Sequence, residues 1–269
     1  MEQVFAPLYV SQRYFGDFVP WVFDDLPLSR ATDGNLLGAY RIAASADVPA
    51  TPTWRYWPGT AQHISYGKTA LWLQTLERML GWDTLQKVLS TFFTRYAYKH
   101  PKPQDFFDVA SQVSGQDLTW FFDQVHRSAA TFDYSVDVFT SEPREDRGVQ
   151  ADSTRPITPS TAGSPYRTAV VVRRQGDGIF PVDVRVVLEN RQEVRWRWDG
   201  RDRWKLFEAD TPVRAISAEV DPDRILLLDP NYTNNSRTLA PRARAAARKW
   251  SLTWLIWLQD HLLTYGFFI

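Results

Sequence analysis

The sequence contains no cysteine among its 269 residues. Disulfide bonds, thiol nucleophiles and thiolate metal sites are therefore excluded. It also has no net charge, because 31 Lys and Arg residues balance 31 Asp and Glu residues. Without a basic excess nothing draws the chain toward nucleic acid, and we expect no nucleic-acid partner. No basic start and no apolar run follow Met1, so the sequence predicts no signal peptide.

Histidine is scarce as well. The four histidines are His63, His100, His126 and His261, and no two form a His-x-x-x-His pair. A zinc peptidase needs two histidines one helical turn apart and a further carboxylate. We therefore expect no metal ligand in this chain, and each histidine is interpreted as a surface or capping residue.

Aromatic residues are abundant, and they crowd the beginning of the sequence. Residues 1 to about 60 are rich in aromatics and proline but show weak periodicity; the aromatics include Tyr14, Phe15, Phe18, Trp21, Phe23, Trp54, Tyr56 and Trp57. This pattern predicts irregular structure laid over another surface, because so much exposed apolar area is unfavourable in water.

From Tyr66 the apolar residues follow helical spacing. Four short amphipathic helices are predicted, joined by tight turns into a helical layer. Gly81 should end the first helix and Asp83 should cap the second, while Gly115 should end the third and Asp117 should cap the fourth. The apolar positions of the first helix are Ala70, Leu73, Leu76 and Leu80.

The period changes to two at Tyr134, which indicates strands. Residues 141–165 contain almost nothing apolar and are predicted to be a long exposed loop. Further strands are predicted at 168–174, 181–188, 193–198, 213–220 and 224–228. Short strands at this spacing favour a small antiparallel β-sandwich.

The end of the sequence is predicted to be an amphipathic helix. A basic flank precedes Trp250, Trp254 and Trp257, and the chain ends at Ile269. The length and the aromatic content of residues 250–269 suit a membrane element, but the polar triplet 259–261 would be costly at the centre of a bilayer. Three alternatives stay open: a helix docked on protein, an anchor at a membrane surface and a membrane-spanning helix.

These elements predict an α+β fold in three parts. Residues 1–132 would form an aromatic-rich segment and the helical layer, residues 133–235 the β-sandwich, and residues 236–269 the C-terminal helix.

One stretch carries a family resemblance. The run from His63 to Leu71 includes Tyr66-Gly67-Lys68-Thr69, and residues 113–124 read Val-Ser-Gly-Gln-Asp-Leu-Thr-Trp-Phe-Phe-Asp-Gln. Over residues 63–139 the sequence resembles the membrane alanyl aminopeptidase family, peptidase family M-one, in its bacterial form. Thr69 replaces the glycine of the family's Tyr-x-Lys-Gly pattern. The resemblance implies that the helical layer is the end of a thermolysin-like catalytic domain.

The resemblance also implies a catalytic role for Tyr66. In the family this tyrosine donates a hydrogen bond to the oxyanion of the tetrahedral intermediate, which suits a phenol because it keeps its proton at neutral pH. The alternative is a half-buried tyrosine that opens a helix. His63 and Lys68 flank Tyr66, and neither is assigned a catalytic role.

The family's zinc motif, its third ligand and its exopeptidase loop all precede the tyrosine, and none occurs between Met1 and Tyr66. We therefore expect the chain to be either a truncated reading frame or a degenerate relative of the family. By itself it should have no peptidase activity and should bind no cofactor. In the intact family member the partners would be zinc, a peptide substrate and the N-terminal catalytic half, in an extracytoplasmic or membrane-associated setting. The alternative is a non-catalytic binding module, with a membrane surface bound through residues 250–269.

Overall fold

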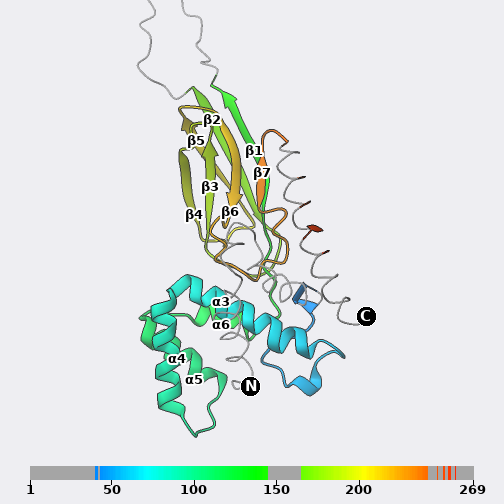
Figure 1. The fold of residues 1–269 in the computed structure, drawn as a ribbon, viewed down its shortest axis with the longest axis vertical. Helices are drawn as coiled ribbons and strands as arrows, with labels where there is room; N and C mark the ends of the chain where they lie inside the picture. Colours follow the sequence, from blue (N-terminus) through cyan, green and yellow to red (C-terminus); the bar gives the residue numbers. More distant parts are fainter. Residues whose placement is uncertain are drawn as a thin grey trace, which may run out of the picture.

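The computed structural model describes residues 40–41, 43–144 and 165–241, together with residues 247, 251, 254, 255 and 258. A layer of helices lies at one end of the molecule and an upright β-sandwich stands on it (Figure 1). The predicted α+β class is confirmed. The three-part division of the chain remains a prediction.

The helical layer follows the predicted periodicity. A short 3-10 helix, η3 (Thr53–Arg55), and a π-helix, η4 (His63–Lys68), precede the four expected helices. These are α3 (Thr69–Leu80), α4 (Trp82–Tyr96), α5 (Pro103–Ser114) and α6 (Thr119–Val125). The chain is already helical at Ala61, before the predicted start at Tyr66.

The two predicted C-terminal ends of helices are confirmed, but the two predicted N-caps are not. Gly81 and Gly115 end α3 and α5 with φ angles of 79° and 68°, which glycine adopts without steric cost. The N-cap of α6 is Leu118, and Asp117 lies one residue before it, where its carboxylate accepts a hydrogen bond from the Thr119 N–H at 2.9 Å. The prediction for Asp83 was wrong, because α4 begins at Trp82 and places Asp83 inside the first turn. Its charge there still faces the positive end of the helix dipole.

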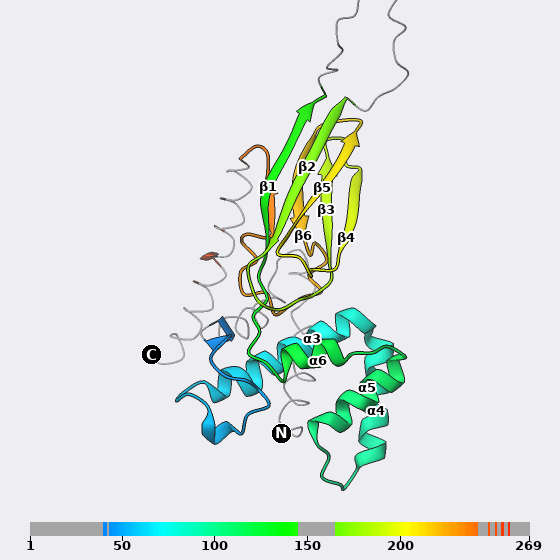
Figure 2. The ribbon, with the colours of Figure 1, turned by 180° about the vertical axis from the view of Figure 1, so that it is seen from behind.

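The sandwich consists of two antiparallel sheets (Figure 2). In the first, β2 (Tyr166–Arg174) lies between β1 (Tyr134–Pro143) and β5 (Trp204–Thr211). In the second, the order is β4 (Glu193–Trp198), β3 (Val182–Leu188), β6 (Ala215–Val220) and β7 (Ser236–Thr238). Alternate residues of β3 are buried, as expected for a strand that covers a core on one side.

Several predicted boundaries in this part were wrong. Residues 224–228 form no strand; Leu226, Leu227 and Leu228 are buried in an irregular segment. Strand β5 was not predicted, and β7 occupies the start of the region expected to be helical. Residues 141–143 belong to β1, and residues 145–164 of the predicted loop lie outside the described residues.

One continuous core joins the helical layer to the sandwich. Phe180, which follows β2, packs against Trp120 and Phe121 of α6, with ring centroids 5.9 and 6.4 Å apart. Leu227 donates its N–H to the Thr75 hydroxyl of α3 at 3.1 Å. These apolar and polar contacts fix how the sandwich sits on α3 and α6.

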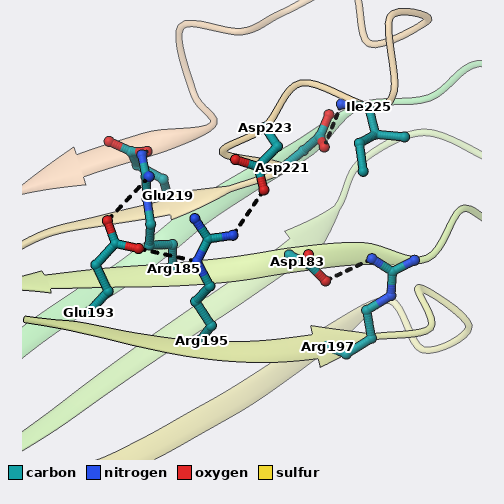
Figure 3. A network of polar contacts seen from close by, with 9 residues as sticks. All are labelled: Asp183, Arg185, Glu193, Arg195, Arg197, Glu219, Asp221, Asp223 and Ile225. Atoms are coloured by element: carbon teal, nitrogen blue, oxygen red, sulfur yellow. Dashed lines mark hydrogen bonds and ion pairs between the residues drawn. The ribbon is translucent and has the colours of Figure 1, made fainter. Parts of the chain in front are cut away.

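The outer face of β3, β4 and β6 carries a network of ion pairs (Figure 3). Arg185 lies between Glu219, at 2.5 Å, and Glu193, at 3.4 Å. Arg195 bridges Glu193 and Asp223, at 3.1 and 2.9 Å. The side chains remain partly exposed, so each pair contributes at most about 1 kcal/mol to stability. On this face of the sheet, the charges of the arginines are therefore balanced by neighbouring carboxylates.

Beyond residue 241, the described residues of the predicted C-terminal helix are helical and exposed, Trp254, Leu255 and Leu258 among them. The remaining residues of the predicted helix lie outside the described part. No helix within the described ranges is long and apolar enough to cross a membrane.

Candidate functional site

Tyr66 lies in the π-helix η4, whose last residue adjoins α3. π-Helical turns are rare and occur frequently at functional sites, because the wider turn redirects side chains. Ile64, Gly67 and Lys68 of η4 are buried, whereas the Tyr66 side chain is 38% exposed. The wide turn therefore anchors three residues in the protein and presents the phenol at its surface.

Lys68 is the unexpected member of this turn, because a lysine in an amphipathic helix is normally exposed. It is fully buried, and its ammonium group donates one long hydrogen bond, of 3.5 Å, to the Ser128 carbonyl just after α6. Burial lowers the pKa of Lys68 to about 8. The contact ties η4 to the end of α6, where carbonyl groups and the helix dipole favour a cation.

The histidines do not gather into a metal site. His63 is half-buried beside Tyr66, with its Nδ1 atom lacking a hydrogen-bond partner, and His100 is exposed. His126 has its pKa lowered to about 4, chiefly by burial and then by the nearby charges of Arg127 and Lys68. His261 lies outside the described residues.

The fit of these residues to zinc is therefore poor. No three His, Asp or Glu side chains within the described ranges are grouped to hold a metal ion. The charges that act on His126 are the cations Arg127 and Lys68, which would repel a metal ion. The described residues of this chain therefore provide no zinc site.

A compact turn packs against η4. The carboxylate of Asp47 accepts hydrogen bonds from the Trp57 N–H, at 3.2 Å, and from the Thr60 hydroxyl. The Thr60 carbonyl then accepts the Ile64 N–H at 2.9 Å, which continues the chain of contacts into η4. Tyr56 is buried against Ala43 and Ile64. The carboxylate of Asp47 and the small apolar cluster around Tyr56 thus hold the turn that precedes the helix of Tyr66.

This turn modifies the expectation for the aromatic beginning of the sequence. Of the residues named for it, Tyr56 is buried, but Trp54 and Trp57 are exposed. Tyr14, Phe15, Phe18, Trp21 and Phe23 lie outside the described residues. Hydrogen bonds through Thr60 therefore connect the turn that carries the exposed indoles to the helix that carries Tyr66, which periodicity alone could not indicate.

Comparison with known proteins supports the resemblance seen in the sequence. Residues 60–125 match the model of the Peptidase family M1 domain. This segment contains Tyr66, all of η4 and α3 to α6. The sequence matches none of the curated proteins.

A solved structure with a similar arrangement is a crystal structure of Legionella pneumophila aminopeptidase A in complex with aspartic acid. The two are 12% identical, with a TM-score of 0.43, over 75% of this chain and 22% of that chain. The chain thus spans about a fifth of the length of that aminopeptidase.

Proposed function

We propose, from the match of residues 60–125 to the Peptidase family M1 domain, that this chain supplies one part of a metallo-aminopeptidase that removes N-terminal residues from peptides. The part consists of the tyrosine-bearing helical layer and the β-sandwich. The observation that carries the proposal is the position of Tyr66, partly exposed on a π-helix inside the matched segment.

The proposed role of Tyr66 is to stabilise developing charge. A phenol donates its O–H to the oxygen that becomes negative when the peptide carbonyl is attacked. A donor fixed in advance is effective because it needs no reorganisation during the reaction. The buried residues of η4 and the contact from Lys68 to Ser128 would hold this phenol in place. Removing such a donor typically costs about two to three orders of magnitude in rate.

We further propose that the chain alone is inactive. Zinc in this family serves to activate water and polarise the carbonyl, and the ligands for it would come from residues other than those described here. The N-terminal catalytic half of the enzyme is therefore the proposed partner of this chain, and a peptide is the substrate of the two together.

The proposal is tested by turnover and by the coding sequence. The purified chain should not hydrolyse alanyl-p-nitroanilide, with or without added Zn²⁺. An in-frame His-Glu-x-x-His motif encoded upstream, together with chelator-sensitive turnover by the longer product, is the supporting result. Chelator-sensitive turnover by the chain alone would contradict the proposed division of the enzyme.

A second candidate function is association with a membrane surface through residues 250–269. It is favoured by the exposed apolar side chains of Trp254, Leu255 and Leu258, which follow a basic stretch in the sequence. Such helices bind anionic lipid by apolar burial and by charge. The chain should then sediment with vesicles that contain phosphatidylserine and remain soluble with purely zwitterionic vesicles. Equal recovery with both vesicle types, or with neither, would count against this function.

A further inference from the structure

The turn that packs against η4 displays two indoles and one guanidinium. Trp54 is 82% exposed and Trp57 is 73% exposed, although tryptophan is usually buried over most of its area. Between them Arg55 is exposed and Tyr56 is buried. Exposed tryptophan and arginine side chains are the residues that most often dominate binding energies in protein interfaces.

The backbone of the turn is held by hydrogen bonds. Its backbone is pinned at Trp57 by the Asp47 carboxylate, and the Tyr56 hydroxyl donates a hydrogen bond to the Pro49 carbonyl at 2.9 Å. The hydrogen bonds from Thr60 to Trp57 and from Ile64 to Thr60 connect the turn to the helix that carries Tyr66. Because the turn is already ordered, a ligand would lose little free energy in ordering it.

The charges of the turn favour a ligand that carries a carboxylate group. Asp47 is the only acidic residue between positions 43 and 60, and its carboxylate already accepts hydrogen bonds from Trp57 and Thr60. Arg55 forms no ion pair with any described residue, and a guanidinium group can bind a carboxylate through two parallel hydrogen bonds. Residues 43–60 therefore offer a cation and two apolar rings, and their single carboxylate already accepts hydrogen bonds within the turn.

We propose that Trp54, Arg55 and Trp57 form a subsite for a short peptide with large apolar side chains and a free C-terminal carboxylate. The indoles would cover the apolar side chains, and Arg55 would pair with the carboxylate. This inference rests on the proposed function, since the same peptide would present its scissile bond to Tyr66. It adds that substrates are short, apolar and held by their carboxyl end.

The test uses isothermal titration of the purified chain with Ala-Leu-Phe as the free acid, Ala-Leu-Phe amide and Ala-Ser-Ser. The free acid should bind most tightly. Trp54→Ala and Trp57→Ala should each weaken its binding at least ten-fold. Arg55→Ala should weaken the free acid about ten-fold and leave the amide unchanged. The matched control is Trp204→Ala, at a tryptophan 57% exposed on β5, which should bind like the parent chain.

Several outcomes would overturn the subsite. They are the absence of Ala-Leu-Phe binding at millimolar concentration, unchanged binding in both tryptophan variants, and an equal loss in Trp204→Ala. All the substituted side chains are exposed, and circular dichroism of each variant verifies its fold. The proposed function is tested by different measurements, namely turnover and the upstream coding sequence. A failure of the subsite can therefore be distinguished from a failure of the proposed function.

Discussion

Tyr134, at the start of β1, allows a quantitative test of the contact between the sandwich and the helical layer. The buried hydroxyl of Tyr134 accepts the Phe180 N–H at 2.7 Å and donates to the Phe180 carbonyl at 3.0 Å. Phe180 in turn packs on α6. Tyr134→Phe removes only the hydroxyl and leaves the buried Phe180 N–H without this acceptor. The lost hydrogen bonds and the stranded donor together should cost about 2–3 kcal/mol of stability.

The assay is equilibrium unfolding in urea. With a slope of about 2 kcal/mol per molar urea, the midpoint should fall by about 1 M. Hydrogen exchange at the Phe180 amide should also accelerate, because its partner is missing. Tyr98→Phe is the control, since the Tyr98 side chain is fully exposed, and it should leave the midpoint unchanged. A loss below about 0.5 kcal/mol in Tyr134→Phe would refute the reasoning.

Three further predictions concern the same region. Arg174→Met should lower the free energy of unfolding in urea by about 2–4 kcal/mol, because the buried guanidinium donates hydrogen bonds to the carbonyls of Gly176, Gly200 and Arg201. A loss below about 0.5 kcal/mol would contradict this. Gly200→Ala should lower the melting temperature by several degrees, because the φ of Gly200 is 71° and an added Cβ would lie 2.5 Å from the Phe180 carbonyl oxygen. An unchanged melting temperature would contradict the close contact. Burial raises the pKa of Asp229 to about 6, so the folded state binds a proton that the unfolded state does not bind between about pH 4 and pH 6. The contribution of Asp229 to stability should therefore increase as pH falls from 7 to 5, while the lowered pKa of His126 acts in the opposite direction. In urea titrations the free energy of unfolding of the parent chain minus that of Asp229→Asn should increase from pH 7 to pH 5; a difference that does not change with pH would contradict the assignment.

The helical layer could be predicted because its signals are local. Gly81 and Gly115 end helices whose apolar residues recur at helical spacing, and these features are visible in the sequence. Asp83 was misassigned because Gly81 serves as the N-terminal boundary of α4, and an acidic residue suits the first turn as well as the cap.

The sandwich was harder to predict because burial there depends on distant partners. The residues of β5 are mostly exposed at the edge of a sheet, so the strand lacks the alternation of apolar residues that marks a half-buried strand. The run of leucines at 226–228 has the composition of a strand. It forms none, because α3 and Asp221 satisfy its backbone N–H groups.

The candidate site was predictable only in part. The residues around Tyr66 indicate the family, but not the π-helical turn that exposes the phenol and buries Lys68. Nor does the sequence show that Asp47 pins the turn carrying Trp54 and Trp57, since that contact spans ten residues of irregular backbone. Both features arise from tertiary packing, which short-range periodicity does not encode.

The proposed role of Tyr66 is tested most directly by steady-state kinetics of Tyr66→Phe in the longer enzyme that joins this chain to its zinc-binding half. The substitution removes one oxygen from a partly exposed side chain, so the fold should be preserved. If the hydroxyl stabilises the transition state, kcat should fall about 100- to 1,000-fold while KM changes little. A kcat within about three-fold of the parent enzyme would contradict the role assigned to this tyrosine.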